Sequence, residues 1–150
     1  GTFNHNSGTI TLAGNSRAFD VNTSLTLNHL TMNKSSGSDV DFGVGDTITV
    51  NGTLTLTEGD FDGDATTTIN AKGAISVGAG FDGSQSATLS PVLLIDGAGA
   101  QSFTVPDGAA LPSITLNQAA TTIDFAVGAN VTMQGDLILQ AGTFTSTSGT

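Results

Sequence analysis

The densest group of acidic side chains lies in the segment EGDFDGD, residues 58–64. Its carboxylates are those of Glu58, Asp60, Asp62 and Asp64, which alternate along the chain. Side chains at alternate positions of a strand point to one face, and calcium is bound by several carboxylate and carbonyl oxygens. The pattern therefore predicts a candidate calcium site, and calcium is the one cofactor that these residues suggest.

A solvated acidic turn is the alternative interpretation of this segment. An EF-hand loop that starts at Asp60 would need glycine at its sixth position and glutamate at its twelfth. This chain has Ala65 and Ala71 there. The glycine-rich repeat of calcium-binding β-rolls is absent too. In this interpretation the carboxylates bind no metal and keep neighbouring molecules apart.

Residues suited to catalysis are sparse in the rest of the chain. Enzymes that act on acidic polysaccharides need clustered carboxylates beside a lysine or arginine base. Asp39, Asp41 and Asp124 occur in DVDF and TIDF, where an aspartate also suits a corner of the chain. The chain has only three Lys and Arg residues, two His, and no Tyr or Trp. We therefore expect no catalytic residues, with a polysaccharide-active enzyme as a secondary alternative, and we expect His5 and His29 to be exposed loop residues.

Threonine triplets raise a second alternative. The triplets are TIT (9–11 and 47–49), TLT (53–55) and TTT (66–68). Flat arrays of Thr-x-Thr on a β-solenoid are the surface by which several ice-binding proteins bind ice. The regularity fails at VLLI (92–95), VTM (131–133) and LIL (137–139). We therefore expect no unbroken threonine plane along the molecule, and the competing explanation is that threonine simply suits the outward positions of a strand.

Short strands must position all of these side chains. Apolar residues alternate with threonine in segments such as TITL (9–12), SLTLN (24–28), TITVN (47–51), TLTLT (53–57) and SITLN (113–117). No window shows the apolar spacing of a helix. The connections contain one to six residues of Asn, Asp, Gly and Ser, which is too short for crossover helices. Three such strands joined by corners close into a coil, and parallel strands of successive coils then pair at about 4.8 Å.

The phenylalanines recur at near-regular intervals, with a mean gap of about 20 residues. They are Phe3, Phe19, Phe42, Phe61, Phe81, Phe103, Phe125 and Phe144. We expect each coil to contribute one ring to a stack inside the core. The sequence therefore predicts an all-β fold, a single right-handed parallel β-helix (β-solenoid) of about seven coils of about 20 residues each.

Longer self-similarity indicates an internal duplication within one segment, residues 1–150. Residues 29–61 align with residues 113–144 at an offset of 84 that drops to 83. The duplication covers roughly 10–61 and 94–144, with an extra coil near 61–81. The chain also opens with GTFNHNSGT and closes with GTFTSTSGT, at the same phase of a coil. We expect the terminal coils to pair with more of the same chain or with another copy, because a bare strand edge is a template for further pairing.

The charge balance limits the partners. The chain carries 13 acidic and three basic residues, a formal net charge of −10, and charged residues make up only 11%. Such a surface repels phosphate backbones, so we expect no nucleic-acid partner. The longest apolar run, LSPVLLI (89–95), is far shorter than the roughly 20 residues of a membrane helix, so we expect no membrane insertion. The chain has no cysteine, which excludes disulfides.

The segments GTFNHNSGTITLAGN, LTLNHLTMNKSSGS and DTITVNGTLTLTEGDF resemble repeats of bacterial secreted and cell-surface β-helix proteins. Among these are autotransporter passengers and filamentous-haemagglutinin-type adhesins. The resemblance covers most of the chain and implies an extracellular or cell-surface location and a role in adhesion or as a spacer. It implies no site residues.

Together these features predict a non-enzymatic structural protein whose partners are other copies of itself or adjacent repeats. Stacking through the terminal coils would build a filament, sheath or stalk. A spacer or binding segment of a large bacterial adhesin is the main alternative. Ice binding by a threonine array and polysaccharide chemistry are the secondary ones.

Overall fold

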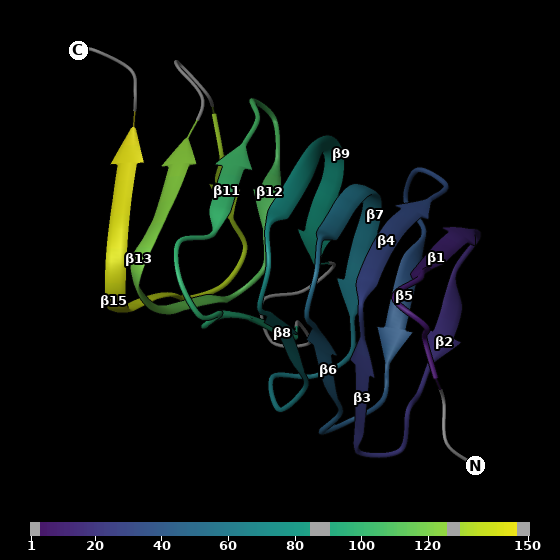
Figure 1. Cartoon of the computed structure of the whole chain (residues 1–150). Helices are drawn as coiled ribbons and strands as arrows, with labels where there is room; N and C mark the ends of the chain where they lie inside the picture. The colour runs from purple at the N-terminus through teal and green to yellow at the C-terminus, as the bar shows by residue number, and fades with distance from the viewer. Residues whose placement is uncertain (1–3, 85–90, 126–129, 147–150) are drawn as a thin grey trace.

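Parallel pairing between successive coils organises the chain. The computed structural model describes residues 4–84, 91–125 and 130–146. The coils follow one another along one axis, from the N-terminal coil in purple to the C-terminal coil in yellow (Figure 1). The fold is an all-β parallel β-solenoid of about six turns, where about seven were expected. Its described residues include no helix that is long and apolar enough to cross a membrane.

Three faces, here called A, B and C, make up each coil. Face A consists of β1 (Thr9–Gly14), β4 (His29–Lys34), the first part of β7 (Leu54–Asp62), the first part of β9 (Ile75–Ser84), β11 (Ser102–Val105), and the last parts of β13 (Ile114–Phe125) and β15 (Leu137–Ser146). Face B consists of β2 (Arg17–Phe19), β5 (Asp39–Phe42), the last parts of β7 and β9, β12 (Ala110–Leu111) and β14 (Thr132–Met133). Face C consists of β3 (Ser24–Leu27), β6 (Thr47–Val50), β8 (Thr68–Ala71), β10 (Val92–Ile95), and the first parts of β13 and β15.

Alternation along each strand fills the core. On face C the inward residues Ile48, Ile69, Leu93 and Ile114 form one column through four coils, and each is buried. Their neighbours along the strands point outward, as the period of two requires. Burial of these columns stabilises the solenoid by roughly 25 cal/mol for each Å² of apolar surface removed from water. The hydrophobic alternation in the sequence is therefore what fixes the inside and the outside of every coil.

The phenylalanine stack is confirmed for four rings. Centroids lie 6.0 Å apart between Phe19 and Phe42, 5.5 Å between Phe42 and Phe61, and 5.1 Å between Phe61 and Phe81, all with edge-to-face geometry. Phe103 is also buried, but it pairs with Ile75 and Ile123 on face A. Phe144 follows in that same column. Phe3 lies outside the described residues, and so does the side chain of Phe125.

Unequal coil lengths explain this change of column. Along face A, Leu30 follows Ile10 by 20 residues, whereas Phe103 follows its partner Ile75 by 28. Phe103 follows Phe81 by only 22 residues. In the longest coil the next phenylalanine therefore arrives on face A, before the chain reaches face B. The coils are also longer on average than the phenylalanine spacing, which gives about six turns.

The two segments that align in sequence lie on different faces. Leu30 belongs to face A, whereas the aligned Ile114 belongs to face C. Likewise the DVDF segment ending at Phe42 runs along face B, and the TIDF segment ending at Phe125 runs along face A. Moving 84 residues along the chain therefore advances the position by several whole coils minus one face. The internal duplication itself stays a prediction.

A buried carboxylate joins the first two coils at the corner between faces B and C. Asp46, only 2% exposed, accepts hydrogen bonds from the backbone N–H groups of Val21 and Thr23, both at 2.9 Å. Between the two donors, Asn22 has φ 53°, and Thr23 has φ 108°. A β-branched residue rarely adopts a positive φ. The backbone N–H groups that bind the Asp46 carboxylate thus flank a strained stretch of backbone at this corner.

We expect the substitution Thr23→Gly to raise the free energy of unfolding by about 1 kcal/mol, because glycine adopts φ > 0 without strain and keeps both backbone hydrogen bonds. Urea unfolding followed by circular dichroism measures the change. Thr26→Gly is the matched control, since Thr26 lies in β3, and there we expect a loss of about 1 kcal/mol. Equal losses at both positions would contradict the strain at Thr23.

Candidate functional site

The four acidic residues of the candidate calcium site do not come together. They are Glu58, Asp60, Asp62 and Asp64. Gly59, with φ 97°, interrupts the alternation, so that Asp60 is 4% exposed and the following Phe61 is 1% exposed. Asp62 accepts a hydrogen bond from the N–H of Gly63 at 2.8 Å. Among the described residues no group of three His, Cys, Asp or Glu side chains could hold a metal ion.

Asp64 closes a turn of its own. Its Oδ1 atom accepts a hydrogen bond from the backbone N–H of Thr66 at 2.7 Å and another from the Thr66 hydroxyl. These bonds, the hydroxyl bond first, hold the pKa of Asp64 below its usual range. The charged form of Asp64 therefore contributes stability above the ordinary pKa of aspartate, and this contribution is lost as the pH falls through the lowered pKa.

We expect Thr66→Val to raise the pKa of Asp64 in the folded protein, because valine keeps the backbone bond and removes the hydroxyl bond. A carboxyl-carbon NMR titration of the variant and of the parent chain measures this shift. Thr26→Val, on face C of the first coil, is the control that should leave the Asp64 titration unchanged. An unchanged pKa in Thr66→Val would show that the hydroxyl bond does not stabilise the carboxylate.

The remaining candidate residues are distributed over the molecule. His29 is half-buried, and its Nδ1 atom accepts a hydrogen bond from the N–H of Thr53 at 2.8 Å, so it is not an exposed loop residue. His5 accepts a bond from the N–H of Ser7 at 3.2 Å. Each imidazole thus binds a nearby backbone N–H, and the two histidines belong to no metal-binding group within the described residues.

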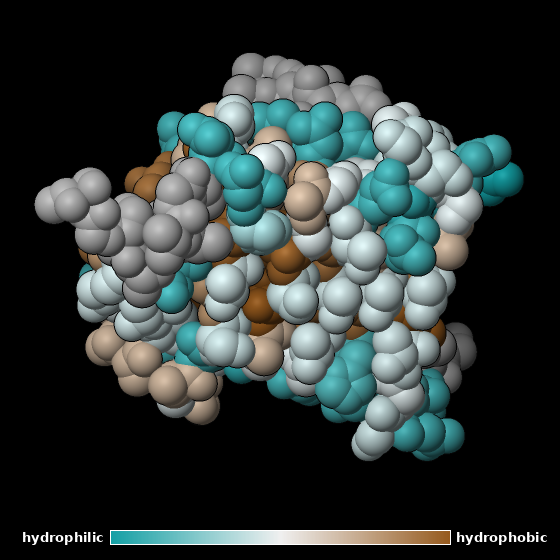
Figure 2. Space-filling model, turned by 90° about the horizontal axis from the view of Figure 1, so that it is seen from above, coloured by the Kyte–Doolittle hydropathy of each residue, from teal (hydrophilic) through white to brown (hydrophobic). Residues whose placement is uncertain are grey.

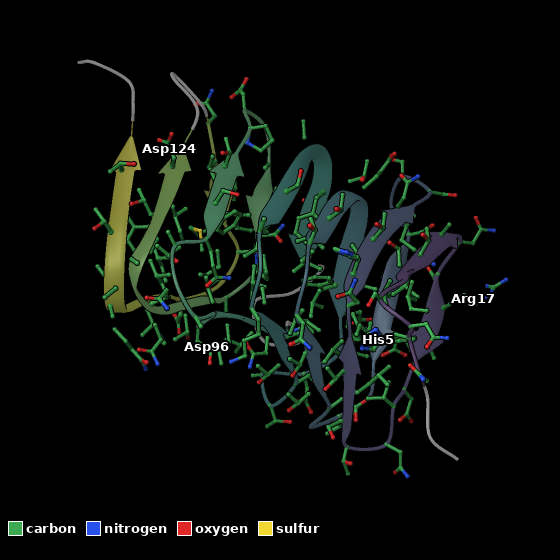
Figure 3. The ribbon with its side chains drawn as sticks, in the orientation of Figure 1. His5, Arg17, Asp96 and Asp124 are labelled. Carbon is green, nitrogen blue, oxygen red and sulfur yellow. The ribbon has the colours of Figure 1, made fainter. Side chains whose placement is uncertain are left out.

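The aspartates near the phenylalanines lie on two different faces. Asp39 and Asp41 belong to β5 on face B, whereas Asp124 lies on face A and accepts a hydrogen bond from the Thr145 hydroxyl at 3.3 Å. Asp124 lies near the C-terminal end of β13, and Asp96 lies beyond the opposite ends of the strands (Figure 3). Asp39 and Asp41 therefore lie beside Asp60 and Asp62 on face B, and Asp124 lies away from them on face A.

Hydroxyl groups, by contrast, gather on the outer side of face A. Two outward columns run along it in strand register, and together they are called the hydroxyl face here. The first column is Thr9, His29, Thr53, Ala74, Ser102, Thr122 and Thr143. The second column is Thr11, Thr31, Thr55, Ser76, Thr104, Asp124 and Thr145. Eleven of these fourteen positions carry a hydroxyl group, and none of the fourteen is buried.

Face A carries no unbroken Thr-x-Thr plane, in line with the expectation, because its two columns include His29, Ala74 and Asp124. The interruptions expected from the sequence lie elsewhere, since residues 92–95 and 137–139 run along face C and residues 132–133 along face B. Face A therefore carries at least one outward hydroxyl group on every strand. Sequence reasoning missed this arrangement because coils of 20 to 28 residues conceal which triplets share a face.

A shallow hollow of about 610 Å³ lies over the C-terminal half of the hydroxyl face. Thr104, Thr122 and Asp124 belong to its lining, and Lys72 lies at the side, paired with Asp96 at 2.7 Å. Gln101 fixes that side, because its Nε2 atom donates to the carbonyl oxygens of Ala71 at 2.9 Å and of Gly73 at 2.8 Å. The lining of the hollow therefore combines hydroxyl groups with small apolar side chains and a few charged or amide groups.

One side of the molecule shows how hydrophilic and apolar residues are distributed on the surface (Figure 2). Seen from above, neutral and hydrophilic residues cover most of the molecule, and apolar residues show between them (Figure 2). Such a surface offers many hydrogen-bonding groups at a low density of charge, and its net charge of −10 repels anions. It suits contacts with neutral, hydrogen-bonding matter.

The structure thus establishes a parallel β-solenoid with a hydroxyl-rich face. Comparison with protein-family models, with curated proteins and with solved structures finds no match to this chain.

Proposed function

We propose that the chain is a non-enzymatic, extracellular structural segment that builds a filament, sheath or stalk by coil-on-coil association with other copies of itself. The observation that carries this proposal is the apolar end of the C-terminal coil. Leu137 and Leu139 continue two inward columns of face C, yet they are 41% and 51% exposed. A further coil stacked on them would bury both side chains.

The N-terminal coil fits this end in register. β1 and β15 lie at opposite ends of the solenoid (Figure 1). Leu25 and Leu27 of β3 occupy the same two inward columns of face C as Leu137 and Leu139 of β15, and four strands lie between β3 and β15. A second copy that continues the helix would thus place leucine on leucine, as the successive coils within one chain do. Such head-to-tail contacts are heterologous and generate open filaments.

A spacer or binding segment of a large adhesin is the alternative. In that arrangement a further coil of the same chain covers Leu137 and Leu139. The resemblance to secreted bacterial β-helix repeats supports this use, as does the low density of charge, with 11% charged residues. Both uses give the chain the same mechanical role, a rod held by hydrogen-bond ladders along its axis.

Negative-stain electron microscopy and sedimentation over a range of concentrations test the proposal. We expect rods that lengthen with concentration for the parent chain and discrete short particles for the double variant Leu137→Asp and Leu139→Asp. Val44→Asp is the control, because Val44 is 78% exposed in the loop between β5 and β6 and its substitution leaves the ends intact. Discrete particles for the parent chain at every concentration would instead favour the adhesin spacer.

A further inference from the structure

We propose that the hydroxyl face binds ice. The two columns repeat in two directions on one sheet, and both repeats are set by the backbone. Residues such as Thr9 and Thr11 lie roughly 6.6 Å apart along a strand, and neighbours such as Thr11 and Thr31 lie about 4.8 Å apart across strands. A crystal of ice likewise presents a two-dimensional lattice of hydrogen-bonding oxygen atoms, so a periodic array of hydroxyl groups is the kind of surface that could match it.

The side chains on this face suit an ordered lattice of water. A threonine side chain is stiff at χ1, because its β carbon is branched, so its hydroxyl and methyl groups keep a fixed direction. The hydroxyl donates and accepts hydrogen bonds, and the adjacent methyl group orders the water around it. Thr31, Thr55 and Thr104 are in register on strands of the same sheet. Bound water therefore meets a rigid pattern and loses little further freedom when it joins a crystal.

The other faces show that this pattern is more than the general preference of strands for threonine. On face B the outward Asp41 pairs with Asp62, which places two carboxylates side by side. On face C the outward column passes through Asn70 and Leu94 and ends at Ile138. All three faces need outward residues that favour strands, yet only face A carries a hydroxyl group in at least one of its two outward columns on every strand.

The chemistry of the face also selects the ligand. Asp124 is the one carboxylate among its fourteen positions and no lysine or arginine belongs to them, so a charged ligand finds little attraction. A crystalline polysaccharide is also flat and periodic, but its sugar rings bind best against aromatic side chains. The chain has no Trp or Tyr, and Phe61, Phe81 and Phe103 are buried in the core. Ice is therefore the periodic neutral ligand that these residues favour.

Thermal hysteresis and partition into a slowly growing ice hemisphere test this inference. We expect the parent chain to enter the ice and to depress the freezing point below the melting point. Thr55→Lys should abolish both effects, because a long charged side chain at the centre of the face breaks the lattice match. Thr49→Lys, at an equally half-buried outward position on face C, should keep both effects.

Thr55→Val separates binding from folding, since it keeps the shape of the side chain and removes only the hydroxyl. We expect reduced ice partition with an unchanged circular dichroism spectrum. Exclusion of the parent chain from ice would overturn the inference, and so would equal losses in Thr55→Lys and Thr49→Lys. Retention of the parent chain on crystalline cellulose or chitin, sensitive to Thr55→Lys and without any ice partition, would assign the face to a polysaccharide instead.

Discussion

The substitution Phe61→Ala is expected to lower the free energy of unfolding by about 3–5 kcal/mol. Phe61 is 1% exposed, and its ring lies between those of Phe42 and Phe81, at centroid distances of 5.5 and 5.1 Å. Alanine would remove the buried ring and leave a cavity between two coils, because the hydrogen-bond ladders on either side hold the coils at a fixed spacing. Both edge-to-face contacts would be lost as well.

Urea unfolding followed by circular dichroism measures this loss. Val44→Ala serves as the control, since Val44 is 78% exposed and its truncation should change the free energy of unfolding by less than about 0.5 kcal/mol. An unchanged midpoint for Phe61→Ala would mean that the ring stack does not hold the coils together. Loss of the same size in both variants would point to a general weakening of the chain and not to the stack.

The fold class could be predicted from the sequence because it depends on local signals. Segments such as TITV (47–50) alternate strictly, and in the structure Ile48 and Val50 are buried while Thr47 and Thr49 point outward. The residues of each strand thus determine by themselves which side chains point into the core and which point outward. The short loops between strands, which leave no room for helices, then require a solenoid or a series of hairpins.

The identity of the faces could not be predicted, because it depends on the sum of all preceding coil lengths. Thr11 and Thr104 share a column although 93 residues separate them, and that separation includes one coil of 28 residues. No local sequence pattern indicates where this longer coil occurs. The phenylalanine period concealed it, since Phe81 and Phe103 keep a regular spacing while they belong to different faces.

The acidic cluster illustrates the same limit on a smaller scale. Alternation from Glu58 to Asp64 predicts one face for all four carboxylates. A single glycine, Gly59 with φ 97°, turns the chain and places Asp60 inside the corner. Glycine adopts such a backbone without steric strain, so its presence permits the turn but does not reveal it. Only the tertiary structure shows that the turn occurs.

The substitution Gly73→Ala is expected to cause the second large loss of stability, because the coils approach each other closely at this glycine. A β carbon at Gly73 would overlap the carbonyl oxygen of Gly52 in the preceding coil. Backbone is the obstacle, so no side-chain rotation relieves the overlap. A β carbon at Gly97 would overlap the carbonyl oxygen of Lys72 in the same way. We expect Gly73→Ala to lower the free energy of unfolding by about 3 kcal/mol, because the coils must separate at this corner.

Gly37→Ala is the matched control, since it separates close approach from backbone conformation. Gly37 has φ 66° and no atom within 4 Å of an added β carbon, so alanine there should cost only about 1 kcal/mol of strain. Urea unfolding compares the two variants. Separation at Gly73 would also lengthen the 2.8 Å bond from the Nε2 atom of Gln101, which fixes the side of the hollow. Equal losses in the two variants would show that backbone strain, and not the spacing of the coils, makes glycine necessary at this corner.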